Sequence, residues 1–166
     1  MNRWQMKMGY LALILCGLVV ANVFIYREVF APPVLTVHVL AVTKDTAVVA
    51  RTPSGATILI DTGPDASILR ALGAALPMWQ RRIDAIVLTS SSAKAVGGLK
   101  AVTSHYRVGT IERSPYGKRL SLDGVFFEVL STASPTALKI SYGSASLLIS
   151  SSTPAGLYTS DGKIIK

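Results

Sequence analysis

An uncharged apolar segment near the N-terminus is the feature that most constrains this chain. Residues Met8 to Tyr26 include no Asp, Glu, Lys or Arg, and most of them are aliphatic. At about 1.5 Å per residue, a helix of this length extends for about 28 Å, close to the thickness of the hydrocarbon core of a bilayer. The segment therefore predicts one transmembrane helix ahead of the rest of the chain.

The residues that flank the segment favour a permanent anchor. Trp4 precedes it, and Tyr26 and Arg27 close it, as residues at a membrane interface do. The alternative is a cleaved signal peptide, processed after Val19-Val20-Ala21. Because the apolar run continues from Val23 to Tyr26, it is longer than the usual core of a signal peptide. We therefore favour an anchor that is not cleaved.

The charges around the segment predict its orientation. Arg3, Lys7 and the terminal amine precede it, whereas Arg27 and the more distant Lys44 follow it. Basic residues favour the cytoplasmic side of a membrane, so we expect a single-pass protein whose later residues lie outside the cytoplasm. The chain then divides into an N-terminal membrane anchor at 1–27, a linker at 28–33 that contains Pro32-Pro33, and a domain at 34–166.

Charge and cysteine content limit the function classes. The formal net charge of +8 favours anionic neighbours such as lipid headgroups or nucleic acid, without identifying one. The single cysteine, Cys16, lies within the apolar segment. One cysteine excludes an internal disulfide and a cysteine-based zinc site.

Short runs of β-branched residues, separated by turn residues, dominate the chain from Val34 onward. The first three runs are joined by short turns and predict an antiparallel meander. Asp65 and Pro77 bound a predicted helix, and a second helix is predicted from Gly98 to Tyr106. The predicted strands are 34–42, 46–52, 56–61, 83–88, 108–111, 125–130, 137–142 and 145–150. This order predicts a mixed α+β domain.

The loop from Leu88 to Leu99 lies between a predicted strand and a predicted helix, where α/β proteins place their chemistry. Its sequence is L-T-S-S-S-A-K-A-V-G-G-L, without His, Cys, Asp or Glu. The two histidines of the chain, His38 and His105, have no second ligand at a suitable spacing, which favours ordinary structural or surface roles for both. We therefore predict no metal and no cofactor.

Weaker candidates for chemistry lie in and near this loop. Lys94 could act as a base for a nearby serine if it were desolvated, although a solvated lysine is the commoner case. Gly97-Gly98 could bind a phosphate through backbone N–H groups, although a tight turn is the commoner case. Asp61 has no titrating neighbour in sequence, and both Asp61 and Asp84 are predicted to be structural.

Several segments resemble the metallo-β-lactamase-like domain of ComEC-type competence proteins, including the forms with a single membrane anchor. The matching segments, which lie between about Ala21 and Ser152, are L-T-V-H-V-L, R-T-P-S-G-A-T-I-L-I-D-T-G-P-D, R-R-I-D-A-I-V-L-T, G-G-L and H-Y-R-V-G-T. The resemblance implies an αββα sandwich, truncated here and preceded by the transmembrane helix. Asp61 and Gly63 match signature positions that support the loop scaffold in the family.

The sequence differs from the family pattern at the positions that carry metal ligands in the family. The family motif T-H-P-D-A-D-H-x-G-G corresponds to T-S-S-S-A-K-A-V-G-G, and D-V-G-Q-G-D-A corresponds to A-V-T-K-D-T-A. By this resemblance, Ser90, Ser92, Lys94 and Ala95 occupy positions of metal ligands, and Ser152 occupies that of a later aspartate. The chain ends before the segment that carries the family's remaining histidine. The site is therefore expected to be degenerate, and Lys94 to supply part of the lost positive charge.

These expectations favour a membrane-anchored pseudoenzyme that acts as a binding or assembly module. DNA or another polyanion is one expected ligand, and a protein of an envelope assembly is another. Two alternatives stay open. One is a residual hydrolase of phosphodiester-type substrates, which uses Ser90 and Lys94. The other is a purely structural partner of an active paralogue.

Overall fold

The computed structural model describes residues 3–29, 34–43, 45–113, 117–131, 137–150 and 153–166. The chain divides into two compact units, Met1–Pro32 and Pro33–Lys166. We describe each unit by itself.

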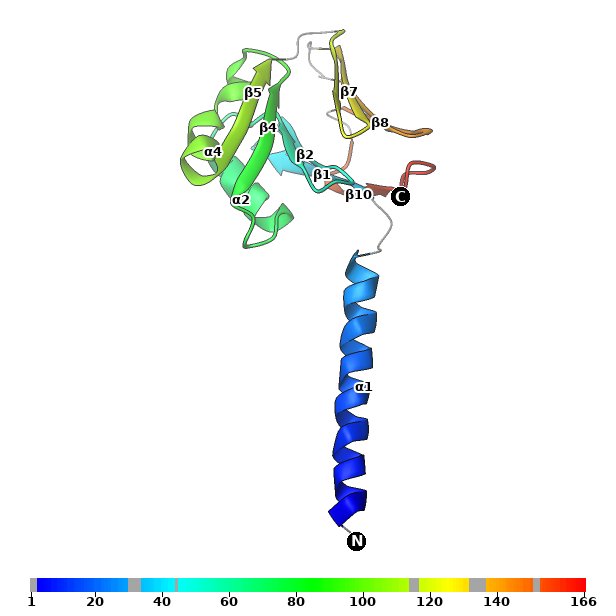
Figure 1. Ribbon diagram of the computed structural model, residues 1–166. Helices are drawn as coiled ribbons and strands as arrows, with labels where there is room; N and C mark the ends of the chain where they lie inside the picture. The colour runs from blue at the N-terminus through cyan, green and yellow to red at the C-terminus, as the bar shows by residue number, and fades with distance from the viewer. Residues whose placement is uncertain (1–2, 30–33, 44, 114–116, 132–136, 151–152) are drawn as a thin grey trace. The chain divides into compact units, whose positions relative to one another are not determined.

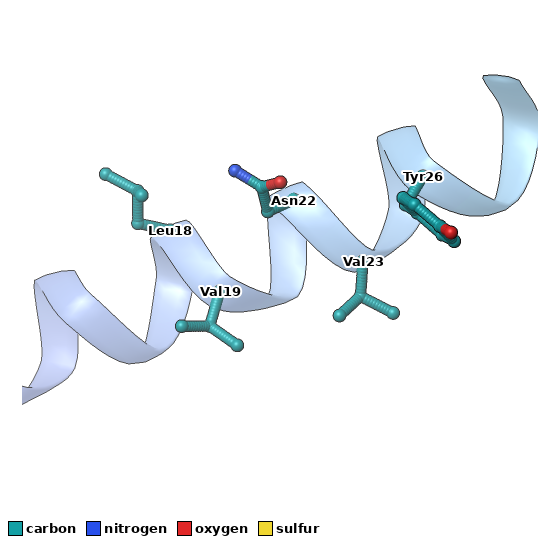
Figure 2. Close-up of a pocket in the computed structure, with 5 residues that line it drawn as sticks. All are labelled: Leu18, Val19, Asn22, Val23 and Tyr26. Atoms are coloured by element: carbon teal, nitrogen blue, oxygen red, sulfur yellow. The ribbon is translucent and has the colours of Figure 1, made fainter.

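The first unit is the helix α1, Arg3–Val29. Its side chains are described from Ala12 to Tyr26, and all of these are exposed. Figure 2 shows one stretch of its surface, where a hollow is lined only by residues of this helix: Leu18, Val19, Asn22, Val23 and Tyr26. In the part of the chain that the structure describes, no helix has the length and apolarity needed to cross a membrane. The transmembrane helix stays a prediction.

The second unit is built on a six-stranded mixed sheet with the order β10-β1-β2-β3-β4-β5. Its β1–β3 region is the predicted antiparallel meander, and β4 and β5 then add in parallel. At the other edge, β10 pairs antiparallel with β1. The strands are β1 Leu35–Val42, β2 Asp45–Arg51, β3 Thr57–Ile60, β4 Arg82–Leu88, β5 Arg107–Arg113 and β10 Gly156–Ser160.

A second, four-stranded antiparallel sheet has the order β6-β7-β8-β9. The predicted hairpin at Gly143-Ser144 is confirmed, since it joins β8 and β9. Asp123-Gly124 forms the turn between β6 and β7, and both residues have positive φ, as tight hairpins require. The strands are β6 Arg119–Leu122, β7 Val125–Ser131, β8 Ala137–Tyr142 and β9 Ala145–Ile149.

Three short helices complete the unit: α2 Ser67–Ala75, α3 Ala93–Val96 and α4 Leu99–His105. Figure 1 shows α2 and α4 on one side of the larger sheet and the smaller sheet on the other. Asp65, the expected cap of this helix, lies one residue before the N-cap of α2, and its Oδ1 accepts a hydrogen bond from Ser67 N (2.8 Å). The N-cap itself is Ala66.

The alternation of apolar residues along the central strands produces two cores. Val37, Val39 and Ile58 face the smaller sheet and pack with Phe127 and Ile140, which lie on that sheet. The opposite faces of the same strands pack against the helices, in a core formed by Leu40, Val49, Leu59, Ile86, Ile68, Leu72 and Val102, among others. The mixed α+β class is therefore confirmed, as three layers in the order helices, sheet, sheet.

Candidate functional site

The candidate site lies where two neighbouring parallel strands end. β3 ends at Ile60 and β4 at Leu88, so the segments that follow them, Asp61–Pro64 and Thr89–Gly98, meet at the same edge of the sheet. In open α/β sheets, this edge is where ligands bind. The predicted loop therefore occupies the position that the sequence analysis assigned to it.

Asp61 joins the two segments. Its Oδ1 accepts a hydrogen bond from Thr89 N (2.8 Å), and its Oδ2 accepts one from Thr89 Oγ1 (2.7 Å). Its own N–H donates to Val87 O (2.9 Å). Asp61 has a φ of +56°, a conformation that costs most non-glycine residues about 1–2 kcal/mol. The structural role predicted for Asp61 therefore has a defined geometry: it fixes the start of the 89–98 loop.

The buried Thr62 fixes the other end of the loop. Both Thr62 N and Thr62 Oγ1 donate to Ala95 O at 2.8 Å. Gly98 N then donates to Gly63 O (2.9 Å). Ala95 is itself buried. The two segments are thus joined along their length by backbone hydrogen bonds.

Gly97 and Gly98 are required by close packing. A Cβ on Gly97 would lie 2.0 Å from Pro64 O, and one on Gly98 would lie 2.2 Å from Thr62 O. Gly97 N donates to Ala93 O (2.9 Å), so both glycine N–H groups are already used within the chain. The expected phosphate cradle at Gly97-Gly98 is therefore corrected to a packing contact between two loops.

Apart from the buried Thr89 and the half-buried Ser90, the polar side chains of the loop are exposed to solvent. Ser90 Oγ and Ser92 Oγ share a hydrogen bond (2.8 Å), and Ser92 precedes the short helix α3. Ser92 and Lys94 are exposed. A lysine acts as a base only when it is desolvated, so the exposed position of Lys94 does not favour a serine–lysine pair. Ser152 lies outside the described residues.

The donor set of the loop does not fit a divalent metal centre. At the positions where the resemblance would place metal ligands, the side chains are two hydroxyls, an amine and a methyl group, whereas such centres use imidazole, carboxylate or thiolate donors. Elsewhere in the described residues, no three His, Cys, Asp or Glu side chains come together as a metal site would require.

The two histidines lie apart from the loop. His38 is half-buried in β1, opposite Val49 of β2, and burial lowers its pKa. His105 is exposed at the end of α4, where its Nδ1 is 3.2 Å from Ala101 O. Both positions agree with the structural and surface roles expected of them.

Asp84 lies near the start of β4, at the end of the sheet away from the 89–98 loop. Its Oδ2 accepts a hydrogen bond from Thr57 N (2.9 Å), and its Oδ1 pairs with Arg82 Nε (2.7 Å). The Thr57 hydrogen bond, aided by Arg82, lowers the pKa of this carboxyl. Asp84 therefore caps the start of β3.

Replacing Asp84 by asparagine is expected to make stability less sensitive to acid. Because the folded-state pKa lies below the unfolded value of about 3.9, the stabilisation is present above that pH and is lost as pH falls through the folded-state pKa. Urea unfolding of the wild type and Asp84→Asn between about pH 7 and pH 2.5 measures this, since the window starts well above the unfolded-state pKa and extends below it. A difference in stability that does not change with pH would contradict the assignment.

Two buried threonines were missed by the sequence analysis. Thr62 and Thr89 each follow an apolar strand and make the hydrogen bonds that hold the loop. Their position at the ends of neighbouring strands was the available signal. Their partners lie 28 to 33 residues away in sequence, so the pattern alone does not identify them.

Comparison with solved structures identifies the fold. One match is a metallo-β-lactamase with a HARLDQ motif from Cronobacter sakazakii, at a TM-score of 0.52 and 22% identity, covering 76% of this chain and 66% of that one. Another is the Rm3 metallo-β-lactamase, at a TM-score of 0.50 and 12% identity, covering 69% of this chain and 57% of that one. No protein-family model and no curated protein matches the chain.

The second unit therefore has a metallo-β-lactamase-like fold. The chain spans no more than about two thirds of the length of these solved proteins. At these identities the likeness concerns the fold, and their activity is considered below as a proposal only.

Proposed function

We propose that this protein is a membrane-anchored, catalytically inactive relative of the ComEC-type metallo-β-lactamase-fold hydrolases, and that it acts as a binding or assembly module. One observation carries the proposal. The loop that would hold metal keeps its scaffold contacts, from Asp61–Thr89 to Gly63–Gly98, while its ligand positions carry hydroxyl, amine and methyl groups. A loop that keeps these contacts but lacks metal-ligating side chains supports a role in binding rather than in metal-dependent catalysis.

The support for anchoring comes from the first unit. In sequence, its uncharged run has about the length of the hydrocarbon core of a bilayer, and the large apolar side chains described on α1, such as Leu13 and Val19, are 53–71% exposed. A helix covered with apolar side chains needs an apolar environment, and lipid supplies one. The positive charges before the run favour a domain outside the cytoplasm.

A residual serine–lysine hydrolase is the second candidate, and it has a direct test. The full chain, purified in detergent, is incubated with single-stranded DNA and with an aryl phosphodiester. We expect no turnover above that of a buffer control. Turnover that Lys94→Ala abolishes, while the exposed Lys163→Ala does not, would replace our proposal by the hydrolase.

DNA binding separates a polyanion-binding module from a purely structural partner. Binding of DNA to the full chain is measured as a function of salt. A chain that neutralises several phosphates loses affinity steeply as salt rises, because counterions are released on binding. Steep salt dependence supports the polyanion-binding form of the proposal. If the chain does not bind DNA at low salt, the module is proposed to bind a protein partner instead.

A further inference from the structure

A β-turn with an apolar tip precedes β4. Gln80 N donates to Pro77 O (2.9 Å) and closes the turn, which places Met78 and Trp79 at its two central positions. These side chains are 87% and 81% exposed, the highest values among the large apolar side chains that the structure describes. Turn tips usually carry Gly, Asn, Asp, Ser or Pro, so two adjacent large apolar side chains here require an explanation.

A basic hollow lies beside this turn. It has a volume of about 660 Å³, and its lining includes Trp79, Arg81, Arg82 and Arg107. Arg107 N donates to Arg81 O (2.8 Å), which places these two arginines next to each other. Arg82 pairs with Asp84, whereas Arg81 and Arg107 have no ion-pair partner among the described residues.

The hollow is distinct from the candidate site. Arg82 and Arg107 begin β4 and β5 and are paired in register, whereas the loop at 89–98 follows the far end of β4. The length of β4, at about 3.3 Å per residue, separates the two by about 20 Å. Nothing in the proposed function uses this end of the sheet.

We propose that the Met78-Trp79 turn and the arginine hollow form a binding site for anionic phospholipid. Tryptophan is favoured at the boundary between headgroups and acyl chains, and methionine adds apolar area that enters the same layer. The arginines then lie at the level of the phosphates, where each basic side chain strengthens attraction to an anionic surface.

Lipid explains the tip better than nucleic acid does. A nucleic-acid site uses aromatic rings for base stacking together with basic groups for phosphates. Trp79 and the arginines satisfy that requirement, but Met78 offers no ring and is the more exposed of the two tip residues. Two adjacent apolar side chains next to arginines match a bilayer surface, where acyl chains lie beneath a layer of phosphate groups.

The test uses the full chain with Trp4→Phe, which leaves Trp79 as the only tryptophan. The protein is reconstituted into nanodiscs of zwitterionic lipid, with or without anionic lipid, and a fraction of the lipid carries bromine near the headgroup end of its acyl chains. Co-elution with nanodiscs reports the anchor, while bromine quenching of Trp79 reports the turn. Protein that does not co-elute is mixed with vesicles of the same lipids. In this way, a failure of the proposed membrane anchor is distinguished from a failure of the proposed lipid site at the turn.

We expect quenching and a blue shift of Trp79 with anionic lipid. Arg81→Gln/Arg107→Gln should shift the equilibrium between the inserted and free turn by about 25-fold, since each arginine contributes about fivefold. The matched control Lys139→Gln/Lys163→Gln removes the same charge elsewhere and should change little. Equal quenching in all variants, no quenching with anionic lipid, or a Trp79 response to single-stranded DNA alone would each overturn the proposal.

Discussion

Replacing Gly98 by alanine is expected to destabilise the domain by about 3 kcal/mol or more, because the added methyl group has no space. It would lie 2.2 Å from Thr62 O, 2.7 Å from Asp65 O and 2.8 Å from Ile68 Cγ2. Two of these three atoms belong to the backbone, which cannot move aside without breaking the contact between the two loops. The φ of Gly98 is −81°, so alanine has no conformational penalty and the whole effect comes from close packing.

Gly73 provides the matched control within the same domain. It lies in α2, where a Cβ would meet nothing within 4 Å. Gly73→Ala should therefore stabilise the protein by about 0.5–1 kcal/mol, through the higher helix propensity of alanine. Urea unfolding of both variants, followed by circular dichroism, measures the contrast. Wild-type stability in Gly98→Ala would show that the two loops do not pack as described.

Replacing Asp61 by alanine is the second change with a large expected effect, a loss of about 4 kcal/mol or more. It removes two hydrogen bonds to a carboxylate and leaves the buried Thr89 N–H and hydroxyl without their acceptor, at a cost of about 1.5–3 kcal/mol each before relaxation. Alanine at a φ of +56° adds about 1 kcal/mol.

Two further variants separate these contributions. Asp61→Gly removes the hydrogen bonds without backbone strain, so it should be about 1 kcal/mol more stable than Asp61→Ala. Asp61→Asn tolerates the same φ and keeps one oxygen acceptor, so it should fall between glycine and the wild type. Unfolding by urea ranks all four proteins. If Asp61→Ala unfolded like the wild type, the carboxylate would have no role in holding the loop.

The central strands were predictable because their signals are local. The β-branched runs and the turn residues Pro53-Ser54-Gly55 placed the meander to within a few residues of β1, β2 and β3. The β6 strand was missed because it is only four residues long and half polar. Its support is tertiary: Arg119 pairs with Glu128 (3.6 Å) and lies over the Phe126 ring (5.2 Å) on the neighbouring strand.

The candidate site was predictable in position but not in its contacts. The order strand, polar loop, helix placed 89–98 at the correct edge of the sheet. The Gly97-Gly98 pair was ambiguous, because a sequence does not distinguish a glycine that binds phosphate from one that admits a neighbouring backbone. Only the approach of Pro64 and Thr62 decides between these roles.

The metal content of the full chain tests most directly the proposal that its metallo-β-lactamase-like fold binds no catalytic metal. The protein is purified from cells supplied with zinc, manganese and iron, and its metals are measured by mass spectrometry. Ser90→His/Ser92→Asp/Lys94→Asp, which places imidazole and carboxylate donors at half-buried or exposed positions of the loop, serves as the positive control. We predict far less than one metal ion per wild-type chain and a gain of zinc in the variant. Stoichiometric metal in the wild type, with hydrolysis of phosphodiesters, would contradict the account.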